Sequence, residues 1–325
     1  MTVLVIFDPA AEERAAAQEM LADLAAVAFL HDLPAAQQVQ ALERAEVIVA
    51  RSFAPGELPR EAIGAVPRLR FVQLVYAGAD NVPFDRFPDQ VVFASNAGAF
   101  AEPLAEHVLA MALALAKNLL PAHLALARGE FGLQEMNRTL RGGACAVIGM
   151  GGNGRAVADV MRAMGMRILA VNRRGRTDVA VDFVGIPDDL PEVLAAADLV
   201  VLTVPLTRQT RNMIGERELA LMKPDAMLVN VARGAVIDQG ALYRHLRRHP
   251  AFRAAIDTWW SEPGAHGAFR MDYPFFELPN LLGSPHNADD VPSIKLPATR
   301  RALENVCRFL TGGQIVGRID PGDYV

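Results

Sequence analysis

The stretch ACAVIGMGGNGRAVADVMRAMG, residues 144–165, decides the fold. Its first five residues are apolar and predict a buried strand, whereas residues 155–164 favour a helix. Between them, Gly149, Gly151 and Gly154 match the pattern G-x-G-x-x-G. The first glycine permits a tight turn, the second lets a pyrophosphate approach the backbone, and the third lets helix and strand pack closely. A bare match is equally typical of an ordinary glycine turn, but this strand–turn–helix context favours dinucleotide binding at the helix N-terminus.

Strand signals continue on both sides of this stretch. After it, short apolar runs bounded by turn residues indicate a parallel sheet buried on both faces; they cover residues 167–172, 197–206, 225–233 and 254–259. Before it, a first series of strand signals alternates with helical patterns; the strands are predicted over residues 3–7, 47–50 and 69–75, with a helix over 11–24. Alternating strands and helices imply parallel strands joined by right-handed crossovers.

The predicted fold is therefore α/β, with two doubly wound parallel-sheet domains of the Rossmann or flavodoxin-like kind. A long helix is expected over 102–127, with Pro121 as the only proline beyond its first turn. The last helix, near 292–310, has no strand series of its own, so we expect it to return to the first domain. The cofactor domain is then inserted into the substrate domain. The predicted segments are the first part of the substrate domain, the NAD(P)-binding domain, and the returning C-terminal helix and tail, at 1–101, 102–290 and 291–325.

Composition narrows the class of protein. Hydrophobic residues make up 52% and charged residues 21% of the 325 residues, which is typical of a well-packed globular chain. A formal net charge of −5 indicates no general attraction to nucleic acid or to anionic membranes. The two cysteines are too few for a disulfide framework and favour a reducing compartment. The N-terminus does not read as a signal peptide, and the apolar helix at 108–116 is too short to span a bilayer. We expect a cytoplasmic protein without a metal site.

The end of the second strand of the cofactor domain carries Asn172, Arg173, Arg174 and Arg176. Folds that bind NAD normally hold a carboxylate there, which bonds the adenosine ribose and would repel a 2′-phosphate. An amide followed by permanently charged guanidinium groups suits that phosphate instead. The alternative is a solvated turn with ordinary surface arginines. We predict NADP(H) as the preferred cofactor, with NAD possible.

Four side chains that could take part in catalysis follow three further strands. Arg233 ends NVAR, Asp257 and Glu262 lie in AIDTWWSEP, and His286 follows the proline of LLGSPHNA. Open α/β sheets bind ligands at the carboxyl ends of their strands. An arginine can hold a carboxylate and polarise a neighbouring carbonyl, and a histidine can donate a proton to a developing alkoxide. A glutamate beside the histidine would raise its pKa. Each residue alone is more often structural; their joint occurrence favours a site.

These motifs together resemble the D-isomer-specific 2-hydroxyacid dehydrogenase family, which includes glyoxylate/hydroxypyruvate reductases. The similarity runs from about Arg51 to the C-terminal helix and rests on the segments VYAGAD, PLAEHVLAMALALAKN, GMGGNG, VPLTRQTRNMIG, NVARGAVID, AIDTWWSEP and SPHNA. It implies hydride transfer between NADP(H) and a small 2-keto acid such as glyoxylate or hydroxypyruvate. Arg233, Glu262 and His286 take the places of the family's catalytic residues.

The resemblance implies two further sets of contacts. The substrate would lie against Arg51 with Ser52 beside it, the backbone of the loop Tyr76, Ala77, Gly78 and Ala79, and Phe100, although Phe100 and Tyr76 are equally compatible with plain packing. The cofactor would contact Gly149, Gly151, Asn153, Gly154, Asn172, Arg173, Arg174, Val204, Pro205, Thr210, Val231, Ala232, Asp257 and Asn287. Asp257 takes the place of the partner of the nicotinamide amide.

The sequence also departs from the family. His286 is followed by Asn-Ala-Asp where two glycines are common at the second and third places, and the pair Trp259-Trp260 suggests a bulkier wall or a core position. A rival interpretation is an NAD(P)H-sensing corepressor-like module without significant turnover. A formate-type or phosphite-type enzyme is a second rival, against which Glu262 argues. We also expect a homodimer, in which the apolar face of the long helix packs between domains or across a two-fold axis; it comprises Val108, Leu109, Met111, Ala112, Leu115 and Leu119.

Overall fold

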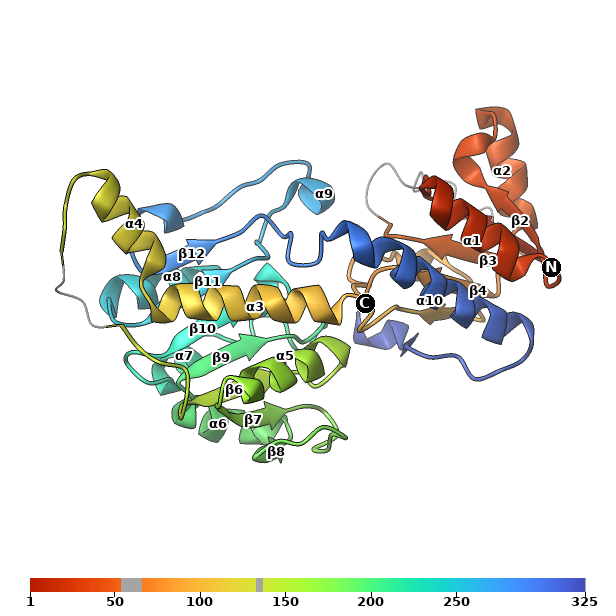
Figure 1. Cartoon of the computed structure of the whole chain (residues 1–325). Coiled ribbons are helices and arrows are strands. Elements are labelled where there is room, and N and C mark those ends of the chain that lie inside the picture. Colours follow the sequence, from red (N-terminus) through yellow and green to blue (C-terminus); the bar gives the residue numbers. More distant parts are fainter. Residues whose placement is uncertain (54–65, 133–136, 325) are drawn as a thin grey trace. The chain divides into compact units, whose positions relative to one another are not determined.

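A computed structural model describes residues 1–53, 66–132 and 137–324 of the chain (Figure 1). The chain divides into two compact units. Unit 1 comprises residues 1–99 and 291–325, and unit 2 comprises residues 100–290. Both units are built around mostly parallel sheets with helices on the faces, which confirms the predicted α/β class. The observed boundary near residue 100 lies two residues before the one predicted from sequence.

Unit 1 contains, in its described residues, a six-stranded sheet in the order β13-β5-β4-β3-β1-β2. The strands are β1 (Thr2–Val5), β2 (Ala26–Phe29), β3 (Val47–Ala50), β4 (Phe71–Leu74), β5 (Val92–Ala94) and β13 (Arg318–Ile319). All pairings are parallel except that of β13 with β5. The helices are α1 (Ala11–Leu21), α2 (Ala35–Arg44) and α10 (Pro292–Leu310).

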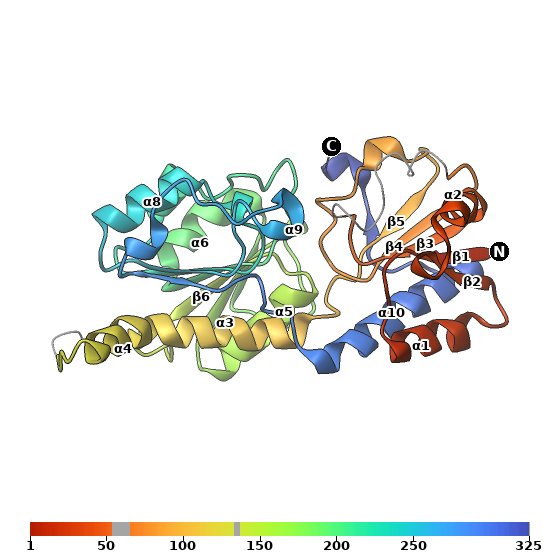
Figure 2. The same cartoon turned by 90° about the horizontal axis from the view of Figure 1, so that it is seen from above.

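The core of unit 1 lies on both faces of this sheet. Successive strand residues point to opposite faces, so Val3 and Val5 pack under α1 and α10 while Leu4 and Ile6 face α2. Figure 2 shows α1 and α10 side by side on one face. The last helix thus completes the unit in which the chain begins.

Unit 2 holds, in the part of the chain described, a seven-stranded parallel sheet in the order β12-β11-β10-β9-β6-β7-β8. Its strands are β6 (Ala144–Ile148), β7 (Arg167–Val171), β8 (Phe183–Gly185), β9 (Leu199–Leu202), β10 (Met227–Asn230), β11 (Arg253–Ile256) and β12 (Leu281–Gly283). Its helices are α3 (Ala101–Ala116), α4 (Leu119–Ala127), α5 (Gly152–Ala163), α6 (Leu190–Ala196), α7 (Glu216–Leu221), α8 (Gln239–Arg248) and α9 (Pro263–His266).

Helices cover both faces of the unit 2 sheet. Helices α3 and α5 pack on one face, and α6, α7 and α8 pack on the other; Figure 2 shows α3 and α5 on one side of the sheet and α6 and α8 on the other. The central strands β6, β9 and β10 are buried along their whole length, as their apolar sequences predict. The carboxyl ends of all seven parallel strands therefore meet at one edge of the sheet, where loops carry the predicted site residues.

The prediction of a single helix over 102–127 is wrong. Helix α3 ends at Ala116, and α4 begins at Leu119 after Asn118, whose φ of 49° lies in the left-handed region. Pro121 explains the break, because it has no N–H with which to bond the carbonyl four residues earlier. Within the first turn of a new helix this missing donor has no cost, and Asn tolerates the left-handed backbone well.

The apolar face predicted on this helix divides into two parts. Val108, Met111, Ala112 and Leu115 are buried in the core of unit 2, so they are not an outer face of that unit. In α4, by contrast, no residue is buried. Among the described residues, no single helix is long and apolar enough to cross a membrane. Helices α3 and α4 meet those criteria when they are counted together, but they are bent by 59° relative to each other.

Candidate active site

The glycine turn between β6 and α5 has the geometry that its three glycines require. Gly149 has φ of 104°, and a Cβ there would lie 2.9 Å from the backbone nitrogen of Val204. A Cβ on Gly154 would lie 1.8 Å from the carbonyl oxygen of Gly149, so only glycine fits. Gly151, by contrast, has nothing within 4 Å of the Cβ position. The open middle glycine leaves room for a pyrophosphate at the start of α5.

A buried polar atom in the same turn supports a bound nucleotide. The side-chain oxygen of Asn153 is buried and has no hydrogen-bond partner among the described residues. Buried polar atoms are rarely left unpaired without a functional reason. A phosphate cannot pair with this oxygen, because both only accept hydrogen bonds, but a hydroxyl of a dinucleotide ribose could donate to it.

The loops that follow β9 and β10 are fixed by their own polar side chains. The hydroxyl of Thr210 donates to the carbonyl of Pro205 at 2.6 Å, so Thr210 closes the loop that begins at Val204. Buried Asn230 accepts from the N–H of Ala232 at 3.0 Å and donates to the carbonyl of Arg233 at 2.9 Å. These bonds hold the backbone after β10 in the turn that presents Arg233.

Asn172, which the sequence predicts to contact the cofactor, shapes the turn at the end of β7. Its side-chain oxygen accepts from the N–H of Arg174 at 2.8 Å, and its amide donates to the carbonyl of Arg176 at 3.1 Å. The residue therefore closes the turn at the end of β7. Arg173 and Arg174 on this turn are exposed to solvent. The turn thus presents cationic side chains at the carboxyl end of β7, and Asn172 shapes it.

The acid–base pair is formed by His286 and Glu262, which lie 24 residues apart in sequence. Nδ1 of His286 lies 2.7 Å from Oε2 of Glu262, and the other carboxylate oxygen accepts from the N–H of Trp259 at 2.6 Å. His286 has φ of 53°, a strained backbone for a non-glycine residue, and its N–H donates to the carbonyl of Asp257 at 2.8 Å. The imidazole is therefore oriented from one side, with Nε2 left for chemistry.

The charges around this pair favour a protonated imidazole. Burial by itself would lower the pKa of His286, but the hydrogen bond and charge of Glu262 outweigh it, and the pKa lies above its ordinary value. Burial would raise the pKa of Glu262, but His286, the Trp259 N–H and Arg233 hold it below its ordinary value. A cationic histidine beside an ionised glutamate is the arrangement of a proton donor near neutral pH.

Arg233 reaches this pair because the next residue is glycine. A Cβ on Gly234 would lie 2.3 Å from the backbone carbon of Trp259, so the loops after β10 and β11 touch there. The Arg233 side chain donates to the carbonyl of Ala232 at 2.8 Å. Its charge acts on both members of the pair. Within unit 2 the structure thus brings together the three residues that the sequence suggested as catalytic.

Asp257 is the centre of a second polar network, which the sequence did not reveal. The carboxylate is only 1% exposed, and Oδ1 accepts from the hydroxyl of Ser284 at 2.5 Å and from the N–H of Asn287 at 3.2 Å. Nε2 of His107, on α3, lies 3.1 Å from the Ser284 hydroxyl. Ser284 and His107 were missed because they come from the loop after β12 and from α3, far from Asp257 in sequence. Their signal was their presence in the segments LLGSPHNA and PLAEHV.

An aromatic cavity of about 630 Å³ borders the pair. Its lining residues are Trp259, Glu262, Pro263, Gly264, Phe269, Phe276, Gly283, Ser284, Pro285 and His286. The indole N–H of Trp259 donates to the carbonyl of Ser284 at 2.8 Å, which fixes the ring in the wall. Trp260 instead stacks on Phe275 at 5.4 Å and bonds the carbonyl of Ile237. Trp259 is thus the wall that the sequence suggested, and Trp260 supports the core.

The predicted substrate contacts lie elsewhere in the chain. Arg51 and Ser52 follow β3, and Tyr76, Ala77 and Gly78 follow the neighbouring β4, so these residues share the carboxyl edge of the unit 1 sheet. Phe100 caps α3 in unit 2 and is 5% exposed. One residue of unit 1 was missed: buried Asn96 donates to the carbonyls of Val75 and Ala298 and anchors the loop after β4.

No group of three or more metal-ligating side chains that could hold an ion occurs within residues 1–53, 66–132 and 137–324. Asp289, three residues after His286, is a further carboxyl group near the pair, and burial raises its pKa. The local chemistry therefore consists of an arginine, an imidazole and carboxylates.

Comparison with known proteins gives consistent results. A family model described as "D-isomer specific 2-hydroxyacid dehydrogenase, NAD binding domain" matches residues 109–288. The D-3-phosphoglycerate dehydrogenase of Methanocaldococcus jannaschii is 30% identical over 96% of this chain, which covers only 58% of that longer protein. The glyoxylate reductase of Aeropyrum pernix is 31% identical over 78% of this chain and 76% of its own length. The solved D-lactate dehydrogenase of Aquifex aeolicus, complexed with NAD and lactic acid, has a TM-score of 0.74 and 26% identity over 96% of both chains.

Proposed function

Because this chain belongs to the D-isomer-specific 2-hydroxyacid dehydrogenase family and is an oxidoreductase, we propose that it reduces a small 2-keto acid with NADPH. The observation that carries the proposal is the 2.7 Å contact between His286 and Glu262 in the field of Arg233. Small acids of the glyoxylate or hydroxypyruvate kind are the proposed substrates, since a curated relative is a glyoxylate reductase.

In this proposal each residue has one role. Arg233 binds the substrate carboxylate and polarises the adjacent carbonyl. Nε2 of His286 donates the proton that the carbonyl oxygen takes up, and Glu262 keeps the imidazole oriented and charged. Asp257 and the backbone of Asn287 hold the polar edge of the nicotinamide site. When bound, the reduced nicotinamide supplies the hydride.

A sensing module without turnover is the alternative function, and the acid–base pair argues against it. A cofactor sensor has no need of an imidazole whose charge a carboxylate maintains. A panel of 2-keto acids with NADPH and NADH, followed by the absorbance of the reduced cofactor, separates the two functions. Turnover with at least one acid supports the enzyme, whereas tight cofactor binding without turnover of any acid supports the sensor.

The cofactor preference is expected to depend on the cationic turn after β7. Replacing Arg173 with Ala is expected to weaken NADPH binding about tenfold while NADH binding stays nearly unchanged. A charge-assisted hydrogen bond to a phosphate contributes about 1.5–3 kcal/mol, and NADH lacks the 2′-phosphate. Titration of each reduced cofactor measures both dissociation constants.

The matched control is Arg167→Ala. Arg167 is an exposed arginine at the opposite end of β7, so the variant removes the same charge from the same strand. Equal affinity of the wild type for both cofactors would contradict the NADPH preference. An equal loss of NADPH affinity in both variants would show that net charge, and not a contact with the phosphate, causes the effect.

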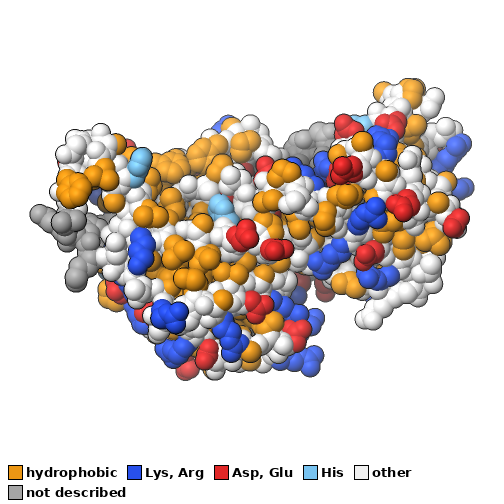
Figure 3. Space-filling model, in the orientation of Figure 1, with side chains coloured by type: hydrophobic (Ala, Val, Ile, Leu, Met, Phe, Trp, Pro, Cys, Tyr) orange, Lys and Arg blue, Asp and Glu red, His pale blue; other side chains and the backbone are white. Residues whose placement is uncertain are grey.

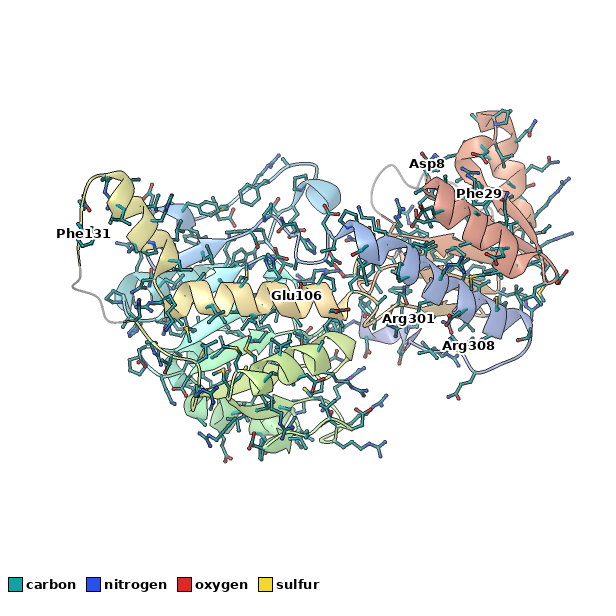
Figure 4. All side chains as sticks on the ribbon, viewed as in Figure 1. Asp8, Phe29, Glu106, Phe131, Arg301 and Arg308 are labelled. Carbon is teal, nitrogen blue, oxygen red and sulfur yellow. The ribbon has the colours of Figure 1, made fainter. Side chains whose placement is uncertain are left out.

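We propose that the chain forms a homodimer through α4. The apolar face of α3, which the sequence suggested, is buried within unit 2. Leu119, Leu120, Leu124 and Leu126 are 38–56% exposed on α4, and Phe131 beyond it is 82% exposed. Figure 3 shows hydrophobic side chains gathered over α4, and Figure 4 shows Phe131 at its far end. Contiguous exposed apolar surface of this kind is typical of an interface between protein chains.

The oligomeric state is expected to change when this surface is made acidic. Wild type should be a dimer at micromolar concentration, and Leu120→Glu with Leu124→Glu should be a monomer, because burying two carboxylates is costly. Light scattering coupled to gel filtration measures the mass. The control Val39→Glu, on exposed α2 of unit 1, should leave the dimer intact. A monomeric wild type would contradict the proposal.

A further inference from the structure

His286 is carried by a short backbone segment that needs support. Its φ of 53° lies in the left-handed region, which a non-glycine residue keeps only where the surrounding structure holds it. The 2.7 Å contact between its Nδ1 and Oε2 of Glu262 depends on that backbone, because the backbone sets the direction in which the imidazole leaves the chain. The groups that hold the segment therefore also hold the acid–base pair.

Asp257 supports this segment on both sides of His286. Its backbone carbonyl accepts from the N–H of His286 at 2.8 Å. Its Oδ1 accepts from the hydroxyl of Ser284 at 2.5 Å and from the N–H of Asn287 at 3.2 Å. One residue after β11 thus holds residues 284, 286 and 287, as long as its carboxylate and the Ser284 hydroxyl keep their orientation.

His107 fixes the direction of the Ser284 hydroxyl. A serine hydroxyl has one proton and a carboxylate oxygen only accepts, so Ser284 donates to Asp257. Nε2 of His107 lies 3.1 Å from the same hydroxyl oxygen, which accepts from it. Nε2 also lies 3.6 Å from Oδ1 of Asp257, so its proton faces both oxygens. The hydrogen bonds therefore run in one direction, from His107 to Ser284 and from Ser284 to Asp257.

The place of His107 on α3 makes it a rigid support. Ala105 and Val108, on the same helix, are buried in the core of unit 2, whereas the His107 side chain is 24% exposed. Helix α3 also packs against β11, the strand that ends just before Asp257. The imidazole thus reaches the loop after β12 from a helix that is fixed to the same sheet, and all of these residues belong to unit 2.

We propose that His107 is a positioning residue for the reaction: its bond to the Ser284 hydroxyl orients the Asp257 carboxylate, which holds residues 284–287 and with them the imidazole of His286. The inference rests on the proposed function, in which Nε2 of His286 donates a proton to the substrate. His107 acts through Ser284 and Asp257, and we assign it no contact with the reacting atoms.

The test compares His107→Leu with His107→Gln. Leucine fills much of the same space without a donor, whereas the side-chain amide of glutamine can donate from nearly the position of Nε2. His107→Leu is expected to lower kcat for a 2-keto acid about tenfold at saturating substrate, the usual effect of losing one hydrogen bond. His107→Gln should recover most of this loss. Equal losses in the two variants would overturn the proposal, because the donor would then not be the cause.

Titration of His286 by NMR gives a second measurement that needs no turnover. Burial lowers the pKa of this imidazole, but the bond and charge of Glu262 outweigh burial and raise it; Arg233 lowers it and Asp257 raises it, and Asp289 also interacts with its charge. In His107→Leu the contact with Glu262 is made less often, so the pKa should fall toward the ordinary value of histidine. In His107→Gln the pKa should stay as in wild type. The signal is assigned with His286→Ala.

This titration distinguishes failure of the inference from failure of the proposed function. A lowered pKa of His286 in His107→Leu, without turnover of any 2-keto acid by wild type, would support the positioning role and reject the proposed reaction. An unchanged pKa in folded His107→Leu would overturn the positioning role whether or not the enzyme turns over.

Two further variants separate this role from the loss of any histidine bond. Nε2 of His31 lies 3.0 Å from the carbonyl oxygen of Ile6 in unit 1, so His31→Leu removes a comparable bond and should change neither kcat nor the titration of His286. Ser284→Ala removes the hydroxyl through which His107 acts, and it tests the same network if His107→Leu does not fold. It should lower both kcat and the pKa of His286, and wild-type values would overturn the proposal.

The double variant tests whether the two residues act in one chain of bonds. Adding His107→Leu to Ser284→Ala should lower kcat by no more than about twofold further, since residues that act through one another are not additive. A full further loss of about tenfold would overturn the proposal, because His107 would then act by a route that does not pass through Ser284. The same effect from His31→Leu as from His107→Leu would overturn it as well.

Discussion

Replacing His286 with Ala is expected to lower the turnover of a 2-keto acid by about 10²–10⁴-fold at saturating substrate, the usual effect of losing a general acid. Cofactor affinity should change little, because Nδ1 of the imidazole is bonded to Glu262 and Nε2 is the atom proposed to contact the keto acid. Steady-state rates and a separate cofactor titration measure the two quantities. His249→Ala, an exposed histidine at the end of α8, is the matched control and should retain full activity.

The pH profile tests whether His286 acts as a protonated acid. Its pKa is raised by Glu262, so the active, charged form persists above the ordinary pKa of histidine and is lost as the pH rises through the raised value. Glu262→Gln removes that charge, and the alkaline limb of the rate profile should move to lower pH. A His286→Ala variant with near wild-type turnover, or a Glu262→Gln profile unchanged on the alkaline side, would contradict these roles.

Replacing Arg233 with Ala is expected to lower kcat/KM by about 10²–10³-fold, because the site loses both its carboxylate partner and the charge that polarises the carbonyl. Both kcat and KM should worsen, whereas loss of a simple binding contact would raise KM alone. Arg233→Lys should recover only part of the loss, since an ammonium group cannot make the two-point contact of a guanidinium.

Arg244→Ala is the control for this variant. Arg244 is an exposed arginine of α8, 3.7 Å from Glu216, and its removal should leave both constants unchanged. An Arg233→Ala variant with wild-type kcat would reject carbonyl polarisation, even if KM were raised. Recovery of full activity by Arg233→Lys would show that charge alone suffices at this position.

The strands of both sheets that were predicted from sequence share one property. Each is a short apolar run between turn residues, and burial on both faces leaves little choice of residue type. The same logic located Arg233, Asp257 and His286, because each closely follows the carboxyl end of a buried strand. Strands β2, β5, β8 and β13 were missed, since two to four residues give too little periodicity.

Contacts between residues that are far apart in the sequence could not be predicted from it. Glu13 meets Arg51 and Thr299 across 38 and 286 residues, and nothing in the local pattern of either segment signals the pairing. The sequence shows that Asn172 stands where an acid is common, but its hydrogen bond to the N–H of Arg174 depends on backbone geometry and could not be predicted. The break at Asn118 was foreseeable in part, because Pro121 cannot lie in the interior of an uninterrupted helix.

The return of α10 to unit 1 has a consequence for biosynthesis. Asn305 donates to the side chain of buried Gln73 at 2.6 Å, and α10 covers one face of a sheet whose strands β1 to β5 are made first. While unit 2 is synthesised, α1 alone covers that face of the sheet, and the part that packs against α10 stays exposed. Unit 2 is a continuous segment and can fold during that interval. The face of the unit 1 sheet that α10 covers is therefore completed only after unit 2 has been synthesised.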